Sequence, residues 1–167
     1  MEHWRDQGIV LSARGHGENA AIVALLTASR GRHAGYVHGA RSAKNAASCE
    51  VGTLVECEWS SRAEGQLGGF SLSTLKAYPA AVMDDATKLA ALQSACALCD
   101  MALPEREACP ALFEGLCALL DILAAHDDPG VWGAAYVMWE IALLRELGFA
   151  LDLTRCGGGG DAKQLAY

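Results

Sequence analysis

The strongest constraint on the fold is a change of hydrophobic period at Pro79. Before it, residues 8–78 divide into short runs rich in β-branched and aromatic residues and separated by glycines, which is typical of β-strands. After it, apolar residues recur every three or four positions, which is typical of amphipathic helices. The sequence therefore predicts an α+β protein with a β-rich N-terminal part and an all-helical part after it.

Five strands are predicted in the first part, and a long link separates the third from the fourth. They span residues 7–14, 19–27, 31–38, 52–60 and 68–78. Five short strands with one long link favour a small barrel of the OB type over a sandwich of seven or more strands. We assign residues 1–80 to this barrel domain.

Three helices are predicted in the second part, which we assign to a helical domain of residues 81–155. The first begins after a cap at Asp84 or Asp85 and ends before Pro104, and the others span 110–125 and 130–147. The third is apolar almost all round, so we expect it at the centre of its bundle. Residues 156–167 form a Gly-rich tail, which we expect to be truncated.

Location and cysteine chemistry follow from composition. No segment reaches the roughly 18 uninterrupted apolar residues that a membrane span needs, and the N-terminus does not resemble a signal peptide. We therefore predict a cytoplasmic protein with no membrane partner. The seven cysteines are an odd number, and we expect thiols packed as small hydrophobic groups rather than a disulfide framework.

Positive charge is concentrated at the N-terminal end of an acidic chain. The whole chain has a formal net charge of −7, yet residues 1–48 carry a net charge of +3 and four of the five histidines. Residues 81–167 carry a net charge of −8. Clustered cations can bind a polyanion even when the net charge is negative. On charge alone, a scattered and solvated set of cations explains the pattern equally well.

Four separate phrases, in order, resemble the RecO family of bacterial recombination mediators. They are WRDQGIVLSARGHGENAAIVALLTASRGRHAGYVHGARS, PAAVMDDATKLAAL, LPEREACPALFEGLCALLDIL and AAYVMWEIALLRELGFALDLTRC, which together run from about residue 4 to 156. The resemblance implies an N-terminal OB domain that binds DNA and a C-terminal helical domain. It also implies binding of single- and double-stranded DNA, strand annealing, partnership with RecR, and contact with the acidic tail of the single-strand-binding protein so that RecA can load.

The DNA-binding candidates come from the N-terminal cations. They are Arg14, Arg30, Arg32, Arg41 and Lys44, with His33 and His38 nearby. The period of a strand places Arg32 and His33 on opposite faces, so both cannot line one groove. Tyr36 and Trp4 could stack on bases, although aromatic residues of small barrels usually belong to the core. For the acidic partner tail we select Arg145, which could equally complement the negative end of its own helix.

No metal, cofactor or catalytic group is predicted. Some RecO-like chains carry a Cys-x-x-Cys near the position of Cys156, but the residue three places further on here is Gly159. Cys96 and Cys99 lie on an apolar helix face, which favours packing over redox or metal chemistry. We predict a protein that is not an enzyme. Two alternatives stay open: an adaptor whose barrel binds a polypeptide, and a cysteine-based redox enzyme.

Overall fold

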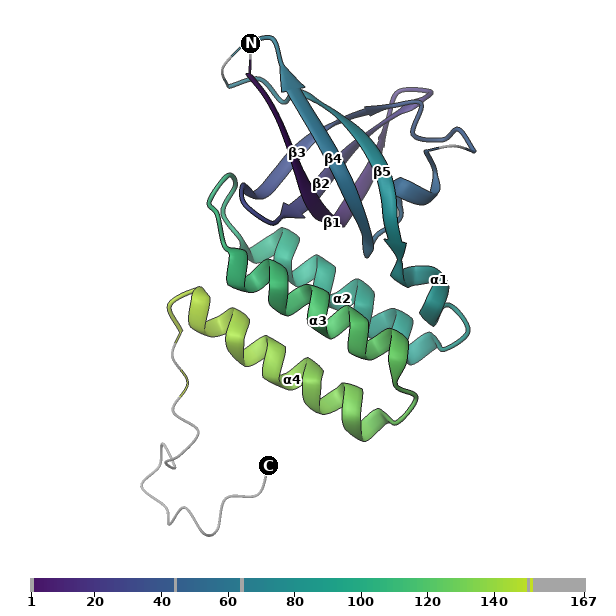
Figure 1. Ribbon diagram of the computed structural model, residues 1–167, viewed down its shortest axis with the longest axis vertical. Helices are drawn as coiled ribbons and strands as arrows, with labels where there is room; N and C mark the ends of the chain where they lie inside the picture. The colour runs from purple at the N-terminus through teal and green to yellow at the C-terminus, as the bar shows by residue number, and fades with distance from the viewer. Residues whose placement is uncertain (1, 44, 64, 150, 152–167) are drawn as a thin grey trace.

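A computed structural model of the chain describes residues 2–43, 45–63, 65–149 and 151. A β-barrel forms one end of the molecule and a layered group of helices forms the other (Figure 1). The strands are β1 (Glu2–His16), β2 (Ala20–Thr27), β3 (Gly31–His38), β4 (Thr53–Ser61) and β5 (Gly69–Ala77), and the helices are η1 (Ala47–Cys49, a 3-10 helix), α1 (Tyr78–Val82), α2 (Ala86–Ala102), α3 (Pro110–Ala125) and α4 (Pro129–Glu146).

The five strands close into a ring in the order β1, β2, β3, β5, β4. β1 is long because its first half pairs with β4 and its second half with β2, and Gly8 and Ile9 pair with both. β3 and β5 meet in parallel through one pair, Tyr36 with Gly69. The α+β prediction, with a five-stranded OB-type N-terminal part, is confirmed.

Alternate residues of the strands fill the interior of the ring, as the two-residue period of a strand requires. Trp4 on β1 and Trp59 on β4 are cross-strand partners and stack with ring centroids 5.5 Å apart. Phe70 completes this aromatic cluster, with its centroid 6.0 Å from that of Trp4. Trp4 therefore belongs to the core and cannot stack on a base.

The helix ends follow the sequence signals closely. The Asp85 side chain accepts hydrogen bonds from the backbone N–H groups of Thr87 and Lys88 and so caps α2. α3 and α4 each begin with a proline, where the missing N–H costs nothing. The short helix α1 was not predicted, because it is only five residues long and leaves no periodic pattern.

The helices share a hydrophobic core with the barrel. Ile9, Leu11 and Leu26 point out of the ring and pack with Leu92 of α2 and Leu116 of α3 in one buried cluster. α2 and α3 thus cover the outer faces of β1 and β2 at one end of these strands, as Figure 1 shows. The other end of the same strands lies away from the helices.

The expectation for α4 was wrong, because this helix is the outermost layer rather than the central one (Figure 1). Only Trp139 and Leu143 of this helix are buried, against α3, while Val137 is 53% and Met138 66% exposed. A helix that is apolar on all sides is able to be buried on all sides, but its sequence does not show that neighbouring elements cover it. None of the helices that the structure describes combines the length and apolarity needed to cross a bilayer.

Candidate nucleic-acid interface

The free end of the β1–β2–β3 sheet brings cations and an aromatic ring together on its outer face. Arg14 on β1 is the cross-strand partner of Ile22 on β2, which is in turn the partner of Tyr36 on β3. Paired residues of neighbouring strands project to the same side of a sheet. The Arg14 side chain is 81% exposed, although its Nη2 lies 3.9 Å from Asp100 Oδ2 of α2, and Tyr36 is partly exposed, so this row faces solvent.

A second row carries two histidines. His16 pairs with Ala20, and Ala20 pairs with His38, so that a small side chain separates two exposed imidazoles. The ring of His16 also contacts that of Tyr36, with centroids 5.2 Å apart. We call the exposed residues of the two rows, Arg14, His16, Tyr36 and His38, the rung surface.

Arg41 lies at the same end of β1. A Cβ built on Gly15 would be 3.2 Å from Nη2 of Arg41, so the guanidinium lies against Gly15, near the end of β1. The Arg41 residue is exposed. Arg14 and Arg41 therefore come from different segments to the same end of the barrel.

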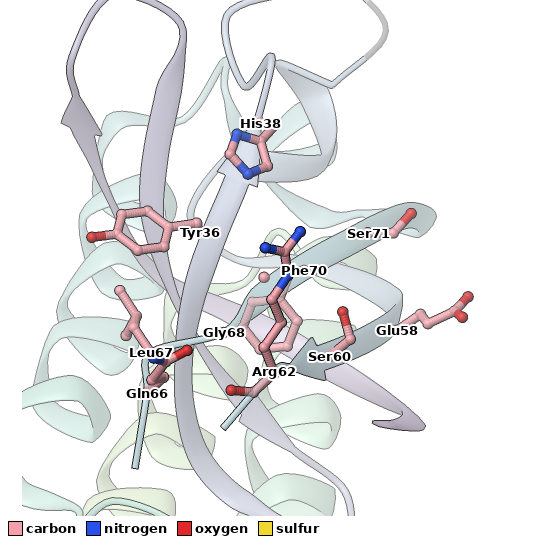
Figure 2. A pocket seen from close by; sticks show the side chains of 12 residues that line it. Tyr36, His38, Glu58, Ser60, Arg62, Gln66, Leu67, Gly68, Phe70 and Ser71 are labelled. Carbon is pink, nitrogen blue, oxygen red and sulfur yellow. The ribbon is translucent and has the colours of Figure 1, made fainter. Parts of the chain in front are cut away.

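A pocket of about 980 Å³ opens between β3 and the link from β4 to β5. Tyr36 and His38 border it on one side, and Arg62 and Gln66 come from the link. Figure 2 shows the Arg62 side chain extending across this space in the direction of His38, with Phe70 behind it. The pocket thus continues the rung surface past Tyr36 and adds a further guanidinium.

Glu58 is the acidic residue among the described lining of this pocket, and its charge is balanced locally. Its two carboxylate oxygens accept from His3 Nε2, at 2.5 Å, and from Arg5 Nη2, at 3.1 Å. The hydrogen bond from His3, followed by the Arg5 charge, lowers the pKa of Glu58, so it stays ionised and paired. Its repulsion of a phosphate is correspondingly reduced.

Arg32, predicted as a DNA contact, is committed to the helical part of the molecule. Its Nε donates to the Leu103 carbonyl at 2.8 Å, its Nη1 lies 3.2 Å from Asp100, and its Nη2 lies 3.4 Å from Glu105. The side chain is only 18% exposed. A group with three partners across a domain contact is poorly available to a phosphate, which corrects the prediction for this residue.

His33 is also removed from the predicted DNA contacts, because it is buried inside the barrel. It is 5% exposed and packs edge-on against Trp59 and Trp4, with centroids 4.7 and 4.9 Å away. Neither ring nitrogen has a hydrogen-bond partner. Burial, and secondarily the Arg106 charge, lowers the pKa of His33 and keeps it neutral at pH 7. The predicted opposite orientation of Arg32 and His33 is confirmed.

The remaining predicted cations are Arg30, Lys44 and Arg145. Arg30 precedes β3 and lies over the Trp4 ring, 5.6 Å from its centroid, at the opposite end of β3 from His38. It therefore does not join the rung surface. Lys44 lies outside the described residues, as do Cys156 and the Gly-rich tail. Arg145 is exposed in the last turn of α4.

Arg62 was missed by sequence reasoning, which searched for cations only in the first 48 residues. The signal that could have found it is its place directly after the fourth predicted strand, because the link between strands four and five borders the ligand face of OB folds. Arg62 is far from Tyr36 in sequence, but the pairing of Tyr36 with Gly69 brings the link that carries Arg62 next to β3.

The link from α2 to α3 touches the wall of the same pocket. The Arg106 backbone N–H donates to the Arg32 carbonyl at 2.8 Å, and its Nη2 donates to the Gln66 carbonyl at 3.4 Å. Arg106 adopts a left-handed backbone conformation, with φ 63°, to make both contacts. The helical part therefore supports the pocket wall directly.

The cysteines of the described chain are buried or partly buried free thiols. Cys96 and Cys99 are fully buried on α2, and burial raises the pKa of each to about 12. Such thiols carry almost no thiolate at neutral pH, so they are poor nucleophiles. Among the residues that the structure describes, no three His, Cys, Asp or Glu side chains gather as a metal site would require.

Comparison with known proteins agrees with the architecture. Residues 1–78 match the family described as Recombination protein O N terminal, and residues 83–167 match Recombination protein O C terminal. A DNA repair protein RecO of Rhodospirillum centenum is 49% identical over 98% of this chain and 65% of its own length. The corresponding protein of Rhodospirillum rubrum is 44% identical over 100% of this chain and 67% of its own length.

A third relative, the DNA repair protein RecO of a Jannaschia species, is 43% identical over 98% of this chain. The chain spans about two thirds of the length of these relatives. Both halves of the chain match in the order in which the barrel and the helices follow one another. The chain therefore belongs to the RecO family of DNA repair proteins.

Proposed function

We propose that this chain is a non-enzymatic, cytoplasmic DNA-binding mediator of recombinational repair. The barrel holds DNA strands by their backbones on the rung surface, and the helices recruit protein partners. Held strands meet their complements more often, which promotes annealing, and the recombinase RecA is helped onto DNA coated by the single-strand-binding protein. The same chain would engage RecR.

Three observations carry the DNA-binding part. Arg14 shares a cross-strand row with the partly exposed Tyr36, Arg62 lines the same pocket as Tyr36, and Arg41 reaches the same end of β1. An electropositive groove with an aromatic platform is the arrangement by which OB folds hold strands without reading their sequence. Arg32 and His33 take no part in it, while Lys44 stays a predicted contact.

The first test is a salt titration of oligonucleotide binding. If Arg14, Arg41 and Arg62 each meet one phosphate of a single strand, the logarithm of the binding constant should fall with the logarithm of salt concentration with a slope of about −2. Fluorescence anisotropy of a labelled oligonucleotide at salt concentrations from about 50 to about 300 mM, where the effect is large, measures this slope. A slope near zero would reject the proposal.

The second test compares two charge reversals that change the net charge equally. Arg62→Glu should weaken DNA binding about tenfold or more, because it replaces an attraction by a repulsion at the pocket. Arg145→Glu is the matched control, since Arg145 lies on α4, across α2 and α3 from the barrel. Equal losses from both variants would show that only total charge matters and that no DNA site exists here.

The partner tail is proposed to bind at α4. The exposed face of this helix includes Val131, Val137 and Met138 and ends at Arg145, which offers an apolar surface with a cation at its edge. The single-strand-binding protein tail combines acidic residues with an apolar end, so its chemistry matches. Arg145→Glu should abolish binding of the tail peptide in a titration, whereas Arg62→Glu should leave it unchanged.

The alternative is an adaptor whose barrel binds an acidic polypeptide. The same cationic end of the barrel could serve it, because carboxylates and phosphates both pair with guanidinium groups. The two functions differ in one measurable respect: a folded wild-type protein that binds no oligonucleotide at low salt would favour the adaptor.

A further inference from the structure

We propose that the pocket beside Tyr36 is a subsite for an unpaired nucleobase, which stacks on the Tyr36 ring while Arg62 meets the adjoining phosphate. This inference rests on the proposed DNA binding and adds the strand class to it: the site selects single-stranded over double-stranded nucleic acid.

Tyr36 is placed as a platform because the next position across the sheet has no side chain. Its backbone N–H donates to the Gly68 carbonyl at 3.0 Å, and its partner on β5 is Gly69. A Cβ built on Gly69 would contact only the Tyr36 carbonyl oxygen, at 3.6 Å. The space beside the ring is therefore open on the pocket side, while His16 supports the ring from β1, with centroids 5.2 Å apart.

The chemistry of the lining suits a base. Besides Tyr36 and Phe70, the lining includes the neutral polar side chains of Ser60, Ser71 and Gln66, which can donate and accept hydrogen bonds. Glu58 also lines the pocket, with its charge paired to His3 and Arg5. Arg62 is exposed at its border and can meet a phosphate. A nucleobase has an apolar face, polar edges and a phosphate attached through its sugar. It therefore needs an apolar wall, a few hydrogen-bonding groups and a cation, which this pocket supplies.

The same geometry disfavours a duplex. In a duplex both faces of each base are covered by its neighbours and the pairing edge is occupied, so no base can enter a pocket without being extruded at a cost of a few kcal/mol. A single strand leaves these faces free, and every base has one, which gives strand selection without sequence selection. The duplex can still bind through its phosphates to Arg14 and Arg41, but more weakly.

The pocket wall is held in place before any ligand arrives. The Gln66 and Leu67 carbonyls of this wall accept hydrogen bonds from Arg106 Nη2 at 3.4 Å and from Trp59 Nε1 at 3.2 Å. A preformed wall reduces the ordering cost of binding. A flexible strand then loses freedom on binding, while the protein changes little.

The experiment compares three labelled probes on the same protein: a thymidine strand, a strand of equal length made of abasic sites, and a hairpin duplex with the same number of phosphates. Wild-type protein should bind the thymidine strand about tenfold more tightly than the abasic strand, because stacking contributes while the phosphates are the same. Tyr36→Phe should keep this ratio, and Tyr36→Leu should reduce it to near one while leaving the salt dependence unchanged.

A second variant guards against misfolding of the first. Gly69→Val should fold, since the site has ordinary space for a Cβ, but it fills the room beside Tyr36 and should weaken thymidine-strand binding about tenfold without affecting the abasic strand. Equal, salt-dependent binding of the thymidine and abasic strands by wild-type protein would overturn the base subsite and leave the proposed function standing. Absence of salt-dependent binding to all three probes would instead overturn the proposed function itself.

Discussion

Arg32 Nη1 lies 3.2 Å from Asp100 Oδ1, so an ion pair joins the third strand of the barrel to the end of α2. Both side chains are largely withdrawn from water, at 18% and 14% exposed. Arg32→Ala should lower the free energy of unfolding by about 1–3 kcal/mol, because Asp100 loses its main partner. Urea unfolding measures this, with the exposed Arg62→Ala, which does not contact Asp100, as the control, expected within about 0.5 kcal/mol of wild type.

The buried His33 should make the barrel sensitive to acid. Its pKa is lowered in the folded state, chiefly by burial, from an ordinary value of 6.5. The unfolded chain therefore takes up this proton first, and the stability that is present above pH 6.5 is lost as the pH falls towards the folded-state pKa. His33→Phe should unfold with a smaller loss of stability between pH 7 and about pH 5 than wild type does. Parallel pH profiles for the two proteins would contradict this account.

Two glycines with nearly the same backbone conformation provide a matched pair. Gly31 has φ 68° and Gly17 has φ 64°, but a Cβ on Gly31 would lie 1.8 Å from the Glu107 carbonyl oxygen, whereas one on Gly17 would meet nothing within 4 Å. Gly17→Ala should cost about 1 kcal/mol, the strain of a left-handed alanine. Gly31→Ala should cost at least about 2 kcal/mol more, because the α2–α3 link must move. Thermal denaturation of both variants checks the difference, and equal costs would mean that the link yields freely.

Thiol reactivity should separate packing from redox chemistry. Cys96 and Cys99 are fully buried, with a pKa of about 12 each, whereas Cys109 is partly exposed. Of these three, iodoacetamide under native conditions should label Cys109, and the α2 pair only after denaturant is added. Peptide mapping by mass spectrometry distinguishes the three sites. Rapid native labelling of Cys96 or Cys99 would revive the cysteine-based alternative.

The regular elements were predictable because their signals are local. The predicted spans 31–38 and 110–125 coincide with β3 and α3, whose ends carry Gly31 and Pro110. The first strand was predicted to begin at residue 7 but begins at Glu2, because charged residues of its N-terminal half conceal the pairing with β4. The location of α4 was wrong because layering depends on neighbours that no local pattern specifies.

The candidate site was predictable only in part. The charge of Arg14 and Arg41 could be read from the sequence, but not that Arg32 would be taken by Asp100 and Glu105, 68 and 73 positions further on. The place of Arg62 depends on how β5 meets β3, which is a matter of topology. Long-range strand pairing decides which residues share a surface, and the composition of the chain carries little information about strand pairing.

The contact of Ile9, Leu11 and Leu26 with the helices has a consequence for how the molecule can be divided and how it can evolve. Separated from its helices, the barrel would leave three large aliphatic groups uncovered, and separated fragments would tend to aggregate. Melting should accordingly appear as one cooperative transition, and substitutions on one side of this contact should be tolerated only with matching changes on the other.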